Sequence, residues 1–241
     1  MPVLTSEPGV ELRQELLSTF RCTRQLSLEL VAPLEAEDFR VQSMPDVSPP
    51  WWNLGHTSWF FGRNILKPFG LYLPQDERLE YVMNSYYEAL GERIPRAERG
   101  LATRPTTNEV RAFRRSVDER MARLIEEVPE EDLERLSFLV TTGIQHEQQH
   151  QELLVTEIKH ILGSNVRALR SAYHRLPAPG GEETPQLSLL PVSGGLLDFG
   201  HCGTSWAWDN EQPRHKAYLE DFRIASRLVT NGEYREFVED G

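Results

Sequence analysis

The chain has 241 residues, 39% of them apolar and 26% charged, which is enough apolar material for a hydrophobic core. Its 26 Lys and Arg against 37 Asp and Glu give a net charge of −11, which argues against nucleic acid or an anionic membrane as the main partner. The two cysteines form no C-x-x-C pattern, and neither a secretory signal nor a membrane-length apolar run is present, so we expect a soluble cytoplasmic protein.

The first half of the chain predicts two helices and an irregular excursion. Residues 9–31 repeat apolar side chains at helical spacing, and Pro33 closes that helix. Residues 51–66 predict a second helix that ends before Pro68. Residues 68–106 lack a long apolar periodicity, and a connection of that length in a compact domain is more often functional than idle.

Two further helices follow. Thr106 and Glu109 have the spacing of a capping box, and an apolar stripe continues beyond them. Residues 131–162 predict a fourth helix, stopped by Gly163. Four amphipathic helices with one long connection predict a four-helix bundle over residues 1–165.

The character of the sequence changes after the fourth helix. Residues 166–186 contain "RLPAPGGEETP" and predict a linker. Residues 187–241 contain short apolar runs, a Gly-Gly turn, and a strand leading to a helix, a pattern typical of an α+β domain. Because about 50 residues is near the lower limit for an independent fold, we expect this second domain to be incomplete.

The fourth helix carries the stretch "QHEQQHQ" at residues 145–151. His146 and His150 are four residues apart, so they lie on the same helix face and can bind one metal ion together. Ile144, Leu153 and Leu154 indicate that the apolar face passes close to this pair. The pair therefore points toward the bundle interior, where facing helices build metal sites.

A third ligand is expected on the second helix. His56 lies there among tryptophans and phenylalanines, and Gly55 before it permits the close approach of another group. His160 lies about 15 Å beyond His150 along the helix and cannot share the ion. Three neutral imidazoles suit Fe(II), Zn(II), Cu or Ni, and they leave coordination positions open, as catalytic sites do.

Residues 146–150 also spell H-E-x-x-H, in which Glu147 would be the general base of a zinc protease. The extended form of that motif is absent, because Thr156 occupies the position of its third histidine. A bundle that binds a metal without catalysis is a further alternative. The residues alone leave these alternatives open.

Three motifs of the bundle resemble one family. "SPPWWNLGHTSWFF", "NSYYEALGERIPRAERGLATRPTTNEV" and "HEQQHQELL" are similar to the DinB-like bundle of the ergothioneine-type sulfoxide synthases. The stretch that begins "GGLLDFGHCGTSWAWDNEQPRH" resembles the start of that family's second, formylglycine-generating-enzyme-like domain, a C-type-lectin-like fold. The resemblance implies a DinB-like bundle at residues 1–165 and the first part of the second domain at residues 187–241.

The resemblance also implies a ligand and substrate set. It places Fe(II) on His56, His146 and His150 and the trimethylammonium group of hercynine near Gln149. The loop that carries substrate-pocket tyrosines and carboxylate-binding arginines in the family matches four residues here: Tyr86, Tyr87, Arg93 and Arg96. Under this interpretation Glu147 has only a helix-surface role.

The implied reaction is the O2-dependent joining of a thiol donor, γ-glutamylcysteine or cysteine, to the imidazole of hercynine. A selenosugar donor would instead make the protein a selenoneine synthase. Because the chain stops near the start of the second domain, we expect either an N-terminal portion of such a synthase or a shortened protein. The oligomeric state is not indicated by the sequence.

Overall fold

The computed structural model describes residues 8–85, 92–164 and 184–241. The chain divides into two units, residues 1–174 and residues 175–241. Within the described ranges, every helix is too short or too polar to cross a lipid bilayer.

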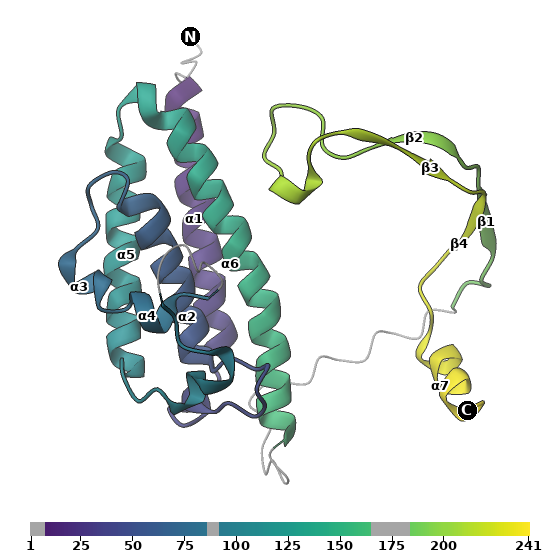
Figure 1. Cartoon of the computed structure of the whole chain (residues 1–241), viewed down its shortest axis with the longest axis horizontal. Helices are drawn as coiled ribbons and strands as arrows, with labels where there is room; N and C mark the ends of the chain where they lie inside the picture. The colour runs from purple at the N-terminus through teal and green to yellow at the C-terminus, as the bar shows by residue number, and fades with distance from the viewer. Residues whose placement is uncertain (1–7, 86–91, 165–183) are drawn as a thin grey trace, which may run out of the picture. The chain divides into compact units, whose positions relative to one another are not determined.

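Four helices form the first unit and lie side by side in Figure 1: α1 (Pro8–Val31), α2 (Pro50–Phe61), α5 (Thr107–Glu127) and α6 (Glu130–Ser164). Helix α2 packs against both α5 and α6, and α1 packs against the same two helices. The sequence-based prediction of a four-helix bundle is therefore confirmed.

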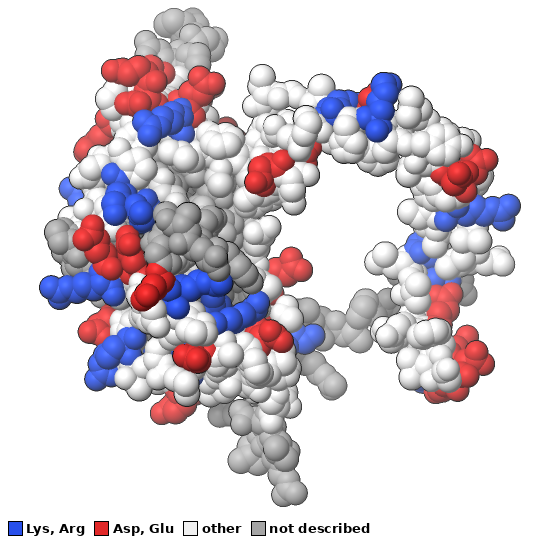
Figure 2. All heavy atoms as spheres, viewed as in Figure 1, with Lys and Arg blue, Asp and Glu red and all other residues white. Residues whose placement is uncertain are grey.

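Short elements occupy the connections between these helices: 3-10 helices Asp38–Arg40 and Arg96–Leu101, a π-helical turn Gly62–Leu66, α3 (Pro74–Glu77) and α4 (Glu80–Met83). The π-helical turn continues directly from α2. Lys and Arg are interspersed with Asp and Glu on the face of the bundle that Figure 2 presents.

A local signal explains the start of α5, whereas another fails at the end of α6. Thr106 begins α5 with the predicted capping box: its hydroxyl accepts from the backbone N–H of Glu109 at 3.2 Å, and its own N–H donates to the Glu109 carboxylate at 2.6 Å. The predicted stop at Gly163 is wrong, because α6 includes that glycine and runs to Ser164. A single glycine costs a helix only about 1 kcal/mol, which the rest of a long helix easily offsets.

Helix α2 is buried on every side and forms the centre of the core. Trp51, Trp52 and Trp59 on this helix are each at most 1% exposed. Two glycines allow close approach: a Cβ on Gly55 would meet the side chain of Met83, and a Cβ on Gly143 of α6 would meet the ring of Phe61. The tight packing of α2 against α6 brings their functional side chains together.

The second unit contains two antiparallel pairs and one helix. Strand β1 (Leu189–Val192) pairs with β4 (Phe222–Ala225), and β2 (Gly195–Phe199) pairs with β3 (His215–Leu219). A 3-10 turn, Asp209–Glu211, precedes β3, and α7 (Asn231–Glu239) follows β4. The predicted strands, with a strand leading to a helix, are confirmed.

Large apolar side chains of this unit are exposed, and no residue described within 184–241 is fully buried. Leu228 is 89% exposed and Phe237 is 73% exposed. The described part therefore has α+β elements without a closed core, and its elements alone do not define a formylglycine-generating-enzyme-like fold.

Candidate metal centre

His56, His146 and His150 converge at the contact between α2 and α6. One ring nitrogen from each lies within 4.8 Å of those of the other two. The Nε2 atoms of His56 and His146 are 3.2 Å apart. His56 is 1% exposed, whereas the two α6 histidines are partly exposed.

A hydrogen bond at Nδ1 fixes the orientation of the His56 ring. Its Nδ1 lies 2.6 Å from the backbone carbonyl oxygen of Met83, which can only accept a hydrogen bond. Nδ1 therefore carries the proton, and Nε2 presents a lone pair toward His146. The predicted close approach at Gly55 is confirmed here, because the same Met83 packs over that glycine.

His150 is oriented by a chain of two further side chains. Its Nδ1 lies 3.0 Å from Oδ1 of Asn53, and the Asn53 amide nitrogen donates to Glu157 at 2.6 Å. Because the carboxylate settles which end of the amide is the oxygen, His150 must donate from Nδ1. Its Nε2 is thereby left as a ligand atom, the arrangement that metal-binding histidines usually have.

Aromatic rings enclose the histidines. The Trp52 ring stacks on His56 with centroids 4.6 Å apart and planes 9° from parallel. Phe60 stacks on His146 at 4.0 Å. Such walls exclude water from the ring faces and strengthen electrostatic interactions inside the cluster.

All three imidazoles are neutral near pH 7. Burial lowers the pKa of His56 well below its ordinary value. Burial also lowers the pKa of His146 to about 4. The pKa of His150 falls to about 3, first through burial, then through its neighbour His146, and last through Arg99 and Arg96. Neutral imidazole is the form that binds metals.

The donor set fits a transition-metal ion. His56 and His150 each present an unprotonated Nε2, and Nδ1 of His146 has no hydrogen-bond partner among the described residues. Lone pairs that face one another at 3.2 Å repel unless a proton or a cation lies between them. A cation with affinity for imidazole nitrogen would remove this repulsion.

Glu147 does not have the helix-surface role expected from its position in the motif. It is 0% exposed. One carboxylate oxygen accepts from Ser27 and Arg114, both at 2.6 Å, and the other accepts from Arg24 at 2.7 Å. A protease general base must be within reach of the metal-bound water, so these engaged oxygens argue against the zinc protease.

The residues expected to bind substrate differ in their contacts and exposure. Arg93 donates to the backbone carbonyl of Ser85, and Arg96 lies 3.9 Å from the Glu157 carboxylate. Gln149 is exposed, next to His150 on α6. Tyr86 and Tyr87 lie outside the described residues.

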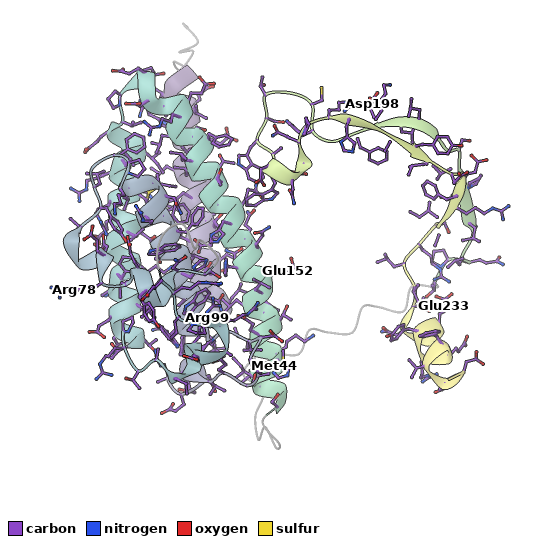
Figure 3. The ribbon with its side chains drawn as sticks, in the orientation of Figure 1. Met44, Arg78, Arg99, Glu152, Asp198 and Glu233 are labelled. Carbon is purple, nitrogen blue, oxygen red and sulfur yellow. The ribbon has the colours of Figure 1, made fainter. Side chains whose placement is uncertain are left out.

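Three residues near the cluster were not predicted from the sequence. Asn53 and Glu157 position His150, as described above. Arg99, labelled in Figure 3, is 3% exposed, and its guanidinium lies 3.4 Å from the centroid of the Trp52 ring. The spacing of Asn53 three residues before His56 gives one face of α2 to both, a signal that helical periodicity could have found. Leu153, assigned to the apolar face, is instead 42% exposed.

Comparison with known proteins agrees with this architecture. The model of the DinB superfamily matches residues 19–154, which include all three histidines. The chain belongs to the DinB superfamily. Its histidine cluster thus lies within the matched bundle.

Curated proteins from three organisms are similar to this chain. "Hercynine oxygenase" of Mycolicibacterium smegmatis is 28% identical over 236 residues, covering 95% of this chain and 51% of that protein. "Hercynine oxygenase" of Mycolicibacterium thermoresistibile is 30% identical over 235 residues, covering 95% of this chain and 49% of that protein. "Ergothioneine biosynthesis protein 1" of Schizosaccharomyces pombe is 48% identical over 33 residues, 14% of this chain and 4% of that protein.

The resemblance to the ergothioneine-type family inferred from the sequence is confirmed by these similarities. The chain spans about half the length of the two Mycolicibacterium relatives it matches.

Proposed function

We propose that this DinB-type bundle binds one Fe(II) ion on His56, His146 and His150 and acts in the oxidative joining of a thiol to hercynine. The observation that carries the proposal is the convergence of three neutral imidazoles within 4.8 Å, two of them held with Nε2 available. The names of the relatives support the substrate class.

The proposed reaction balances without a further reductant. The imidazole C–H bond of hercynine and the S–H bond of the donor break, a C–S bond forms, and O2 supplies one oxygen atom to the sulfoxide and one to water. Iron(II) with open coordination positions supplies the O2 chemistry.

The side chains of this protein would hold the ligand rings and orient the substrates. Asn53 and the Met83 carbonyl hold two ligand rings in fixed tautomers, so the lone pairs point at one place before the metal arrives. Trp52 and Phe60 keep water from the ring faces. Gln149, exposed beside His150, is proposed to contact the trimethylammonium group of hercynine. Tyr86 and Tyr87 are proposed to line the substrate pocket.

A carboxylate-bearing donor is favoured by the basic side chains. Arg93 and Arg96 are proposed to bind its carboxylates, because a guanidinium can hold a carboxylate through two parallel hydrogen bonds. Arg96 already lies 3.9 Å from one carboxylate, that of Glu157. γ-Glutamylcysteine and cysteine both fit this chemistry, whereas a selenosugar offers no carboxylate to these arginines.

We further propose that residues 187–241 are the first part of a formylglycine-generating-enzyme-like domain, joined to the bundle by a linker at residues 166–186. The two antiparallel pairs and α7 support this. The exposed apolar side chains of this unit fit a domain whose core is incomplete.

The test begins with metal. Anaerobic Fe(II) should bind at one ion per chain, and His56→Ala should reduce the iron retained after desalting by at least about tenfold. Unchanged iron binding in His56→Ala would show that the three-histidine assignment is wrong. O2 consumption is then measured with hercynine and, in separate trials, γ-glutamylcysteine, cysteine and a selenosugar.

A non-catalytic metal-binding module is the second candidate. It predicts one bound iron and no thiol-dependent O2 consumption with any donor. Consumption that requires both hercynine and a thiol supports the synthase instead, and the donor with the highest kcat/KM identifies the second substrate.

A further inference from the structure

Two pairs of polar residues, each four apart, lie on adjacent faces of α6. His146 and His150 face His56 of α2. Glu147 and Gln151, each one position later, are buried against α1. One position on a helix is a rotation of about 100°, so one short stretch serves two neighbouring helices.

We propose that Glu147 is a positioning residue, which fixes the rotation and register of α6 and thereby aims His146 and His150 at His56. This inference rests on the proposed metal centre. It gives the glutamate of the H-E-x-x-H stretch a role without any proton transfer.

The contacts of Glu147 define a closed cluster. Arg24 of α1 and Arg114 of α5 donate to it from two different helices, at 2.7 and 2.6 Å. Arg24 also pairs with Asp118 at 2.6 Å. Two arginines and two carboxylates therefore cancel in charge, which is what allows such groups to be buried.

Neutral groups complete the cluster. Ser27 donates to Glu147 at 2.6 Å, and the Gln151 amide donates to the same serine oxygen at 3.0 Å and to the Thr23 carbonyl at 2.8 Å. Arg114 also donates to the Arg24 carbonyl at 2.7 Å. Helix α6 is thus held at two successive turns by directional bonds.

Directional bonds are needed because apolar packing alone tolerates a small roll of a helix. Leu, Ile and Val side chains can repack at modest cost, whereas a buried carboxylate cannot leave its arginines. A ligand pair on the same helix needs placement within about 0.5 Å to bind a metal well. Glu147, next to His146 in the chain, supplies that constraint at the point where it is needed.

The bundle contains a matched control. Asp76 pairs with Arg120 at 2.7 Å, and both side chains are at most 8% exposed. This pair ties α5 to α3, and neither residue belongs to the histidine cluster or its hydrogen-bond partners. Its loss should lower stability without turning α6.

The experiment compares Glu147→Asp with Asp76→Asn in the full chain, using Co(II) alone as the probe. Glu147→Asp keeps the charge balance and retracts the carboxylate by one methylene, so α6 must turn or the bonds must lengthen. We expect Co(II) affinity to fall about tenfold or more and the visible absorption of bound Co(II) to change. Asp76→Asn should lower the unfolding temperature while leaving the affinity and the spectrum as in the unaltered chain.

Ser27→Ala is the second variant, because it removes one donor and no charge and so is expected to fold even where Glu147→Asp does not. It should shift the Co(II) spectrum in the same direction by a smaller amount. Wild-type affinity and spectrum in Ser27→Ala and in folded Glu147→Asp would overturn the positioning role, as would an equal loss of affinity in Asp76→Asn. An unaltered chain that binds no Co(II) or Fe(II) would overturn the metal centre itself and the positioning role with it.

Discussion

Nδ1 of His150 lies 3.0 Å from Oδ1 of Asn53, although 97 positions separate the two residues in the sequence. Asn53 in turn donates to Glu157, which lies two helical turns beyond His150 on α6. The ligand ring is therefore held by a residue from the opposite helix, and that residue is anchored back to the helix of the ligand.

We call the hydrogen-bonded chain from His150 through Asn53 to Glu157 the relay, and replacing Asn53 tests it. Asn53→Ala leaves His150 free to rotate or change tautomer, so we expect Fe(II) affinity to fall by about 10- to 100-fold. The control is Ser43→Ala, which removes the hydroxyl that lies 2.7 Å from Nδ1 of His160, a histidine outside the cluster. Isothermal titration under anaerobic conditions measures both. Equal affinities in the two variants would contradict the relay.

Metal binding should stabilise the bundle. At a free Fe(II) concentration of about 100 times Kd, the linkage adds about 2.7 kcal/mol to the free energy of unfolding. His56→Ala should cut the rise in unfolding temperature on adding Fe(II) to about half or less, and His160→Ala should retain the full rise. Scanning calorimetry with and without the metal checks this. An undiminished rise in Tm in His56→Ala would place the ion elsewhere.

The two glycines of α6 should respond oppositely to alanine. A Cβ at Gly143 would overlap the buried ring of Phe61, so Gly143→Ala is expected to cost about 1–3 kcal/mol of unfolding free energy. At Gly163 nothing lies within 4 Å of the added Cβ, and alanine is the better helix former, so Gly163→Ala should gain up to about 1 kcal/mol. Urea unfolding of both variants gives the comparison. Similar destabilisation by both would argue against close α2–α6 packing.

The start of α7 should be sensitive to acid. Hydrogen bonds from Arg227 and from Thr230 lower the pKa of Glu233 to about 2. Because this pKa is depressed in the folded state, the stabilisation is complete above the ordinary value of 4.5 and is lost as the pH falls toward 2. NMR titration of labelled glutamate carboxyls measures the shift directly.

Arg227→Gln should raise the pKa of Glu233 toward its ordinary value. Arg235 lies on the same helix as Glu233 but pairs with Glu239. Arg235→Gln should therefore leave the pKa of Glu233 at about 2. A pKa of Glu233 that does not respond to Arg227→Gln would contradict the assigned cause.

Much of the bundle could be predicted from local patterns. Helical periodicity and the capping box at Thr106 depend on residues within a few positions of one another, so the sequence displays them directly. The pairing of His146 with His150 is equally local, because helix geometry alone puts them on one face. The predicted stop at Gly163 failed since one weak breaker does not outweigh a long, well-packed helix.

The sequence by itself determined that four helices form and that two histidines share a face, because both follow from spacing along one chain segment. Tertiary structure alone decided that Glu147 is buried between Arg24 and Arg114, which lie 123 and 33 positions away. Periodicity says which residues leave a helix on the same side, but it does not say which side meets which neighbour. A glutamate that reads as a surface residue or a catalytic base in the sequence is therefore, in the fold, the counter-ion of two buried arginines.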